Sequence, residues 1–303
     1  MYLLVTIVAV GVIALIVHSN QPVTRSTATS TSTSTSSSTT STSIRTSTTT
    51  TSRPSTSSRQ ARLDGALASF LHQRTGSVEV AVENIASNDI WSYGGSTPQD
   101  EASVVKVNIL AALLAKGRGS MNTLTSTQRR LATQMIEESD NDAATDLWNA
   151  AGASRGIGAF DKSVGLVSTT PSPCVVCTGF AWPGWGLTTT TPRDQLKLLR
   201  ALFISKGYLN AVDSAYELRL MRSVEPDERW GVSSGIPSNV SVALKNGWLP
   251  LNNADTDWQI NSIGWVRGDA RNYLVALLST GNPSEQYGIQ TLDSVSSLIW
   301  RYG

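Results

Sequence analysis

The order of the predicted elements indicates an α+β fold. Two strands come first, near residues 78–82 and 90–93, and the turn between them predicts a hairpin. The middle of the chain is helical, and three strands followed by a helix complete it. Strands and helices are therefore grouped along the sequence, whereas a parallel βαβ fold would alternate them.

Hydrophobic periodicity predicts the individual elements. Apolar residues recur at helical spacing over residues 60–74, while Val78, Val80 and Val82 alternate with polar or small residues as in a strand. The segment Thr191-Pro192-Arg193-Asp194 is a strong helix start, because it combines a hydroxyl cap, a proline in the first turn and an acid at N3. Further helices are predicted over residues 103–114, 126–138, 142–152, 154–165, 192–205, 211–222 and 284–300, and further strands over 240–247, 258–266 and 272–280.

Residues 166–190 show no periodicity and are predicted to form one long loop. Loops of this length inside a compact domain are usually functional or mobile. The loop contains Trp182-Pro183-Gly184-Trp185-Gly186, and Trp248 comes just after Lys245. These aromatic residues either line a cleft or pack the loop onto the core, and the sequence leaves both interpretations open.

Charge is distributed unevenly along the 303 residues. Five of the 24 basic residues and none of the 23 acidic residues precede residue 63, so 19 basic and 23 acidic residues remain, a formal charge of −4. A mildly acidic domain without a basic stripe argues against nucleic acid as a partner. The remainder is long enough for one large domain, and we expect it to be a monomer.

The first 20 residues are predicted to be a signal peptide or an N-terminal membrane anchor. Residues 2–17 are apolar and carry no charge, and their number lies between a signal-peptide core and a short membrane span. Residues 21–59 are mostly Ser and Thr, a composition that cannot bury enough apolar surface to fold. We therefore expect a disordered stalk, followed by a folded domain over residues 60–303 that lies outside the cytoplasmic membrane, either secreted or tethered.

A hydroxyl and an amine lie three residues apart in Ser103-Val104-Val105-Lys106, at the start of a predicted helix. Positions i and i+3 share a helix face, so the two side chains can meet. A serine becomes a nucleophile when an adjacent base takes its proton, and a desolvated lysine can be that base. Alone, this spacing is weak evidence, because a capping serine followed by a surface lysine is common.

Two further motifs follow in order, Ser139-Asp140-Asn141 and Lys245-Asn246-Gly247. Together with the first motif they resemble the S-x-x-K, S-D-N and K-T-G signature of class A β-lactamases and penicillin-binding proteins. The resemblance extends over most of residues 60–303. It implies an antiparallel β-sheet flanked by helices, with an all-helical lobe, and an exported active-site-serine hydrolase that needs no metal or other cofactor.

The resemblance also implies a role for each matching residue. Ser103 would attack an amide carbonyl, Lys106 would accept its proton, and Ser139 would pass a proton to the leaving nitrogen with help from Lys245. The substrate would be a β-lactam or a peptide of the D-alanyl-D-alanine type.

The substrate-binding residues implied are Asn141, Asn246, Gly247 and Trp248. Asn141 would bind the substrate's side-chain amide, and the backbone N–H groups of Ser103 and Trp248 would form the oxyanion hole. Asp140 is expected to hold its loop rather than to take part in the chemistry.

Two departures from the family pattern concern turnover. Class A enzymes use a loop glutamate to activate the water that deacylates the enzyme, yet no Asp or Glu occurs between Lys162 and Arg193. Asn246 also replaces the usual Thr or Ser, which removes a hydroxyl from the substrate carboxylate. We therefore expect slow deacylation. A cell-wall DD-peptidase-like enzyme and a tethered, non-catalytic module that binds cell wall or β-lactam remain as alternatives.

Other catalytic and metal sites have little support in the sequence. His18 and His72 are the only histidines, and His72 is predicted to be a half-exposed helix residue rather than part of a Ser-His-Asp triad. Cys174 and Cys177 have no partner ligands nearby for zinc. They are expected to form a small disulfide that stiffens the loop, with a redox-active pair as the alternative.

Arg267 and Arg271 lie near a predicted strand turn, where they are expected to be solvated rather than to bind a carboxylate.

Overall fold

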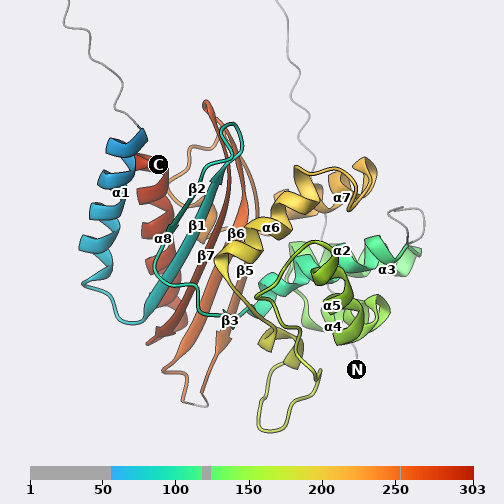
Figure 1. The fold of residues 1–303 in the computed structure, drawn as a ribbon. Helices are drawn as coiled ribbons and strands as arrows, with labels where there is room; N and C mark the ends of the chain where they lie inside the picture. Colours follow the sequence, from blue (N-terminus) through green and yellow to red (C-terminus); the bar gives the residue numbers. More distant parts are fainter. Residues whose placement is uncertain (1–55, 118–123, 253) are drawn as a thin grey trace, which may run out of the picture. The chain divides into compact units, whose positions relative to one another are not determined.

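An antiparallel sheet of five strands organises the residues that the computed structural model describes, which are 56–117, 124–252 and 254–303. The strand order is β2-β1-β7-β6-β5, so β5 lies at one edge and β1 pairs with the last strand of the chain (Figure 1). The strands are β1 (Ser77–Asn84), β2 (Ile90–Tyr93), β5 (Ser241–Pro250), β6 (Trp258–Gly268) and β7 (Arg271–Asn282).

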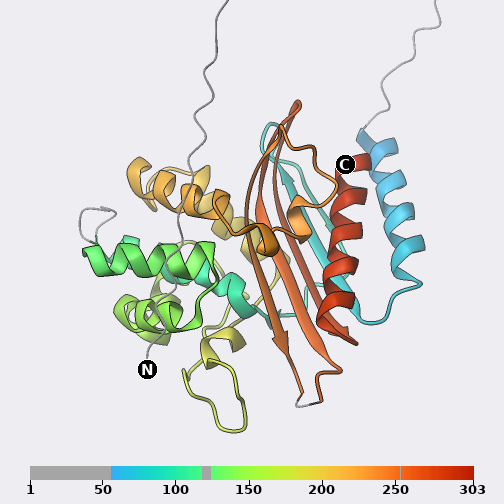
Figure 2. The ribbon, with the colours of Figure 1, turned by 180° about the vertical axis from the view of Figure 1, so that it is seen from behind.

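Helices cover both faces of this sheet. The helices α1 (Thr56–Leu71) and α8 (Glu285–Tyr302) pack side by side on one face, and the helical lobe lies on the other (Figures 1 and 2). The lobe consists of α2 (Val105–Lys116), α3 (Ser126–Glu137), α4 (Asn141–Ala151), α5 (Ala153–Ser163), α6 (Pro192–Phe203) and α7 (Ala211–Arg222). Each face of the sheet has its own apolar core, one containing α2 and α4 and the other containing α1 and α8. The α+β prediction, with a flanked antiparallel sheet and a helical lobe, is confirmed.

The predicted helix starts agree with the capping chemistry. Thr125 caps α3 in a reciprocal capping box with Gln128, and Asp140 caps α4 by accepting a hydrogen bond of 2.6 Å from Ala143 N–H. Thr191 caps α6, with Pro192 at its first position. The expectation that Asp140 holds its loop is therefore confirmed.

Several boundaries differ from the predictions. The first helix begins at Thr56, so the last residues of the predicted stalk are helical. The rest of the stalk and the apolar leader, residues 1–55, lie outside the described residues. Two short strands were not predicted, β3 (Gln99–Asp100) and β4 (Thr189–Thr190), because two residues carry no detectable alternation. No helix in the described ranges has the length and apolar character needed to cross a bilayer.

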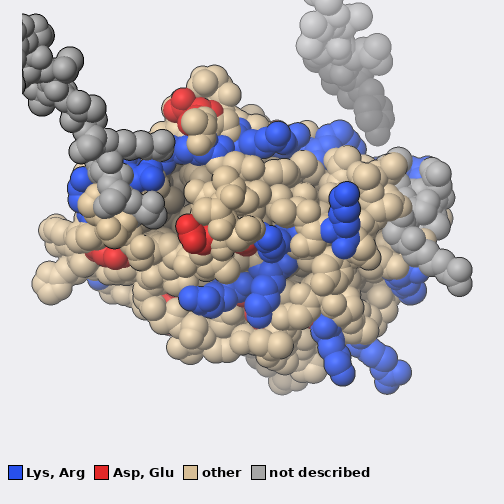
Figure 3. Space-filling view, turned by 45° about the horizontal axis from the view of Figure 1, so that its top comes forward, with Lys and Arg blue, Asp and Glu red and all other residues tan. Residues whose placement is uncertain are grey.

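Basic side chains gather on one end of the domain. Figure 3 shows that Lys and Arg predominate over Asp and Glu on this face, although the domain as a whole has a slight excess of acid. Arg267, as expected for a strand turn, is exposed, while Arg271 is half-buried with its guanidinium 4.4 Å from the Trp300 ring centroid.

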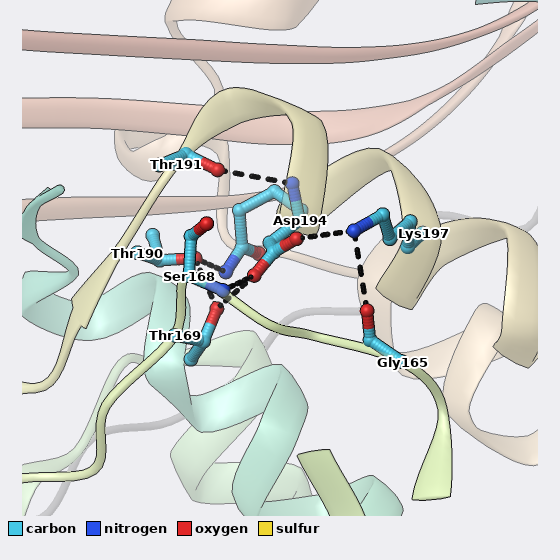
Figure 4. A network of polar contacts seen from close by, with 8 residues as sticks. Gly165, Ser168, Thr169, Thr190, Thr191, Asp194 and Lys197 are labelled. Atoms are coloured by element: carbon cyan, nitrogen blue, oxygen red, sulfur yellow. Dashed lines mark hydrogen bonds and ion pairs between the residues drawn. The ribbon is translucent and has the colours of Figure 1, made fainter. Parts of the chain in front are cut away.

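The start of α6 anchors the long loop through Asp194 (Figure 4). One carboxylate oxygen of this buried residue accepts hydrogen bonds from Ser168 N–H at 2.6 Å and from the Thr169 hydroxyl at 3.1 Å. The other oxygen forms an ion pair with Lys197 at 2.8 Å. The Thr190 hydroxyl bonds to that of Thr169, and the Thr191 hydroxyl accepts from Asp194 N–H. The network therefore joins the first residues of the long loop to the residues that follow its end.

We predict that Asp194→Ala lowers the free energy of unfolding by about 1–3 kcal/mol, because the buried donors of Ser168 and Thr169 lose their acceptor. Urea denaturation followed by circular dichroism measures this change. Asp146→Ala, which removes an exposed acid from α4, is the matched control and should have little effect. Equal stability of the two variants would contradict the anchoring role of Asp194.

Candidate active site

Ser103 lies in a single turn of 3-10 helix, η1 (Ala102–Val104), which leads directly into α2. Its side chain is buried, with 9% relative exposure. The preceding residue, Ala102, has a φ of +50°, which is uncommon for a residue with a side chain. Such backbone strain persists only where neighbouring structure holds it in place, and it is frequent at functional sites.

Hydrogen bonds from the sheet hold the chain just before Ser103. Asn261 on β6 donates its side-chain amide to the carbonyls of Asp100, at 2.8 Å, and Glu101, at 3.0 Å. Glu101 N–H donates to Thr188 O at 2.7 Å. The serine turn is therefore held from two sides, by β6 and by the end of the long loop.

Gly247 allows β5 to approach the serine turn very closely. A Cβ atom added at this glycine would lie 2.7 Å from Ser103 N and 2.9 Å from Glu101 O. Any side chain would therefore push β5 and η1 apart. This contact brings the Ser103 N–H, which lies at a helix start where N–H groups have no intrahelical partner, next to the Gly247–Trp248 backbone that is expected to complete the oxyanion hole.

Two buried lysines converge on Ser139, the residue that precedes the cap of α4. Lys245 Nζ donates to Ser139 Oγ at 2.9 Å, and Lys106 Nζ lies 3.1 Å from the same oxygen. Lys106 Nζ also donates to Ser139 O at 2.5 Å and to Asn141 Oδ1 at 2.9 Å. Ser139 has a φ of +56°, so the backbone is strained here too. The structure thus brings all four residues proposed for catalysis to one place, since Ser103 and Ser139 line the same pocket.

The two lysines differ in their electrostatic surroundings. Burial, and then the charge of Lys245, hold the pKa of Lys106 well below its usual value. Burial lowers the pKa of Lys245 to about 8, with partial compensation from the carboxylate of Glu228. The Glu228 carboxylate, 3.7 Å from Lys245 Nζ, favours the charged form of Lys245, whereas the hydrogen-bond partners of Lys106 are neutral oxygens.

The partners of Lys106 fix where its lone pair can point. An ammonium uses three N–H groups, whereas a neutral amine donates two hydrogen bonds and accepts one. Ser139 O and Asn141 Oδ1 can only accept, so the Ser139 hydroxyl is the one partner that can donate to the neutral amine. No hydrogen bond joins Ser103 Oγ to Lys106 Nζ among the described residues. Direct transfer of the Ser103 proton to Lys106 would require Lys106 to turn from Ser139 toward Ser103.

The residues expected to bind substrate take different positions. Asn141 and Trp248 line the pocket beside Ser103. Asn246 does not, because its fully buried amide donates to the backbone carbonyls of Glu228, at 2.6 Å, and Trp230, at 3.2 Å. Successive side chains of a strand point to opposite faces, so Lys245 and Gly247 face Ser103 while Asn246 points away. A contact between the Asn246 side chain and a substrate carboxylate would require it to leave these bonds.

Glu228 is a charged residue of the site that the sequence did not reveal. It ends the short helix η4 (Pro226–Glu228), and its carboxylate lies 3.7 Å from Lys245 Nζ. Burial raises the pKa of Glu228, and the charges of Lys245 and Lys106 oppose this increase. Because η4 belongs to no motif and has no periodicity, only the proximity of residues 226–228 to β5 in space identifies it.

Aromatic residues of the long loop line the pocket that contains Ser103. Trp182, Pro183 and Trp185 lie over Ser103, and the space that remains is about 40 Å³. Trp185 is buried, and its ring centroid lies 5.0 Å from Lys106 Nζ. Cys174 and Cys177 form a disulfide in the same loop, as expected for a structural clip. The two interpretations of these aromatics therefore both hold: Trp185 packs inward and also lines the pocket.

The acids that flank the long loop in sequence are committed to structural contacts. Asp161 accepts a hydrogen bond of 2.8 Å from Asn108, and burial raises its pKa to about 7. Asp194 holds the loop entrance. Among the described residues, no three His, Cys, Asp or Glu side chains gather in a metal-binding arrangement. His72 is exposed just beyond α1.

Comparison with known proteins identifies the family. The model of the beta-lactamase enzyme family matches residues 114–302, which is more than half of the chain. The chain belongs to the beta-lactamase enzyme family. The matched range includes Ser139-Asp140-Asn141 and Lys245-Asn246-Gly247 and begins after Lys106.

Solved structures of class A β-lactamases share the fold. An ancestral class A β-lactamase has a TM-score of 0.66 and 22% identity, and the match covers 79% of this chain and 99% of that one. The class A β-lactamase from Mycobacterium abscessus has a TM-score of 0.65 and 18% identity, covering 79% and 98%. A β-lactamase from Xanthomonas campestris gives 0.68 and 18%, covering 80% and 98%. At these identities the comparison establishes the fold alone.

A curated relative comes from mycobacteria. The protein named "Putative lipoprotein LppW" of Mycobacterium tuberculosis is 26% identical over 209 residues, which are 67% of this chain. The chain spans 62% of the length of that relative, and the protein of the same name from Mycobacterium bovis gives the same values.

We predict that Glu228→Gln lowers the pKa of Lys245 below its value of about 8. The carboxylate of Glu228 stabilises the charged form of Lys245, so its removal lets the ammonium lose its proton at lower pH. NMR titration of isotope-labelled lysine side chains measures this shift. Glu225→Gln, an exposed acid three residues earlier, is the control. An unchanged Lys245 pKa in Glu228→Gln would contradict the ion pair.

We also predict that Gly247→Ala destabilises the domain by about 1–3 kcal/mol, since the added Cβ cannot fit between β5 and η1. Denaturant unfolding provides the measurement. Gly65→Ala on α1 is the control, because a Cβ there meets nothing within 4 Å. If both variants unfold at the same denaturant concentration, the close approach of β5 to Ser103 is not a constraint.

Proposed function

We propose that this protein is an active-site-serine hydrolase that forms an acyl-enzyme at Ser103. In this mechanism Ser103 Oγ attacks a carbonyl carbon and passes its proton to neutral Lys106. The backbone N–H groups of Ser103 and Trp248 stabilise the oxyanion. As the amide bond breaks, the leaving nitrogen takes a proton from the Ser139 hydroxyl, which Lys106 then reprotonates.

The observation that carries this proposal is the shared contact of two buried lysines with Ser139 Oγ, at 2.9 and 3.1 Å. The mechanism needs one neutral amine and one cation, and the Glu228 carboxylate beside Lys245 favours the charged form of Lys245. A structural role alone would not favour two adjacent buried cations, because burial and mutual repulsion both oppose them.

The substrate that we propose is a β-lactam or a peptide of the D-alanyl-D-alanine type, with slow deacylation. The family supports the reaction type, and the absence of an acid from the loop over Ser103 supports the slow step. A cell-wall DD-peptidase-like activity needs no loop glutamate of the class A kind and remains the second candidate. A non-catalytic binding module is the third.

We further propose an extracytoplasmic location, with the domain of residues 60–303 secreted or tethered by the N-terminal apolar segment. The Cys174–Cys177 disulfide is consistent with an oxidising compartment. A relative named as a lipoprotein supports attachment to a membrane. In this chain the apolar residues 2–17 would provide such attachment.

The test is intact mass spectrometry of the purified chain after incubation with a penicillin. We predict a covalent adduct of the mass of the intact penicillin that persists for many minutes, is absent in Ser103→Ala and is strongly reduced in Lys106→Ala. Ser294→Ala on α8 is the control and should label like the wild type.

Rapid disappearance of the penicillin without a stable adduct would contradict slow deacylation. No adduct under any condition would contradict acylation by β-lactams. Release of D-alanine from a D-alanyl-D-alanine peptide would favour the peptidase candidate.

A further inference from the structure

The side of Lys106 that faces the long loop is occupied by Trp185. This residue lies in the short helix η3 (Gly184–Leu187), and its side chain is 2% exposed. Its indole N–H donates to the Thr145 hydroxyl at 3.0 Å, and that hydroxyl donates to Asn141 O at 3.0 Å. The ring is therefore fixed to α4, the helix that supplies Asn141 to the site.

An indole cannot perform the step that releases an acyl group. In hydrolysis, a water attacks the ester carbonyl carbon, loses one proton to a base, and the bond to Ser103 Oγ then breaks as the oxygen takes up a proton. Indole has a single donor and no acceptor, so it cannot take the proton of the water.

The carboxylates whose charges raise the pKa of Lys106 are those of Glu228 and Asp140. Both already interact with other groups. Glu228 lies beside Lys245, and Asp140 caps α4. On the Trp185 side, the pocket is lined by Trp182, Pro183 and Gly186. No described residue therefore offers a base from that side.

The disulfide determines the position of the indole. Gly184 packs directly on it, because a Cβ at this glycine would lie 2.2 Å from Cys177 Sγ and 2.5 Å from Cys174 O. Gly184 N–H also donates to Val175 O at 2.6 Å. The disulfide-bonded turn of residues 174–177 thus presses on the backbone immediately before Trp185.

We propose that Trp185, held in place by the Cys174–Cys177 turn, excludes the deacylating water from Lys106 and Ser103 and so determines the lifetime of the acyl-enzyme. Trp185 would thereby determine the outcome of the reaction, because Ser103 can be acylated while hydrolysis of the acyl-enzyme is slow. The disulfide then links acyl-enzyme lifetime to the redox state of the loop. This inference rests on acylation of Ser103, as proposed above.

The experiment measures the lifetime of the penicillin adduct in the full chain by intact mass after removal of excess penicillin. We expect a shorter lifetime in Trp185→Ala and in the double variant Cys174→Ser/Cys177→Ser. Trp185→Glu places a carboxylate beside Lys106, and we expect it to accelerate release by about 10²-fold, as a general base does. Trp300→Ala on α8 removes a distant half-buried tryptophan and should leave the lifetime unchanged.

A second readout does not depend on penicillin. Hydrogen exchange of the Trp185 indole N–H, followed by NMR, should be slow in the wild type and faster in the double cysteine variant. Adduct lifetimes that are equal in the wild type and all three site variants would overturn the inference, as would equal indole exchange. If the wild type forms no adduct, the proposed function fails, and the indole exchange still decides whether the disulfide turn holds Trp185 over Lys106.

Discussion

The burial of two lysine amines against one hydroxyl is the constraint on which the rest of the site depends. Isolated buried ammonium groups are very unfavourable, and two neighbouring ones repel each other. The protein resolves this conflict by supplying a carboxylate at Lys245 and carbonyl acceptors at Lys106. The result is an asymmetric pair, because a carboxylate lies beside Lys245 while the oxygens bonded to Lys106 are neutral.

Ser139 can serve both amines because its backbone is held in an unusual conformation. Its positive φ turns the chain between α3 and α4, and Asp140 fixes the following helix start. Ala102, which precedes the nucleophile, is also at positive φ. One strained backbone position therefore immediately precedes Ser103 and the other is Ser139 itself, as is common at functional sites.

The sequence predicts that Ser103, Lys106 and Lys245 share a site because short motifs of fixed spacing mark them. It predicts the main elements because their apolar periods are regular. Side-chain alternation along β5 also predicts that Asn246 points to the other face of the sheet from Lys245 and Gly247, which the motif alone does not indicate. Glu228 could not be assigned from the sequence, and Trp185 was one of several loop aromatics that could either line a cleft or pack the loop. Both lie in irregular segments, and their relation to the lysines arises only from the way distant segments pack. The strands β3 and β4 escaped prediction for the related reason that they are too short to show a period.

The sheet order gives the assembled site a further property. β1 pairs with β7, so the hairpin near the start of the domain cannot join its neighbour until nearly the whole chain is present. Lys245 comes from β5, the edge strand on the far side of β6 and β7. Long-range pairings of this kind form late, because the loop between them must close first. A growing or partly folded chain thus carries Ser103 before Lys245 and Gly247 are in place beside it, and the site is assembled only when the sheet is complete.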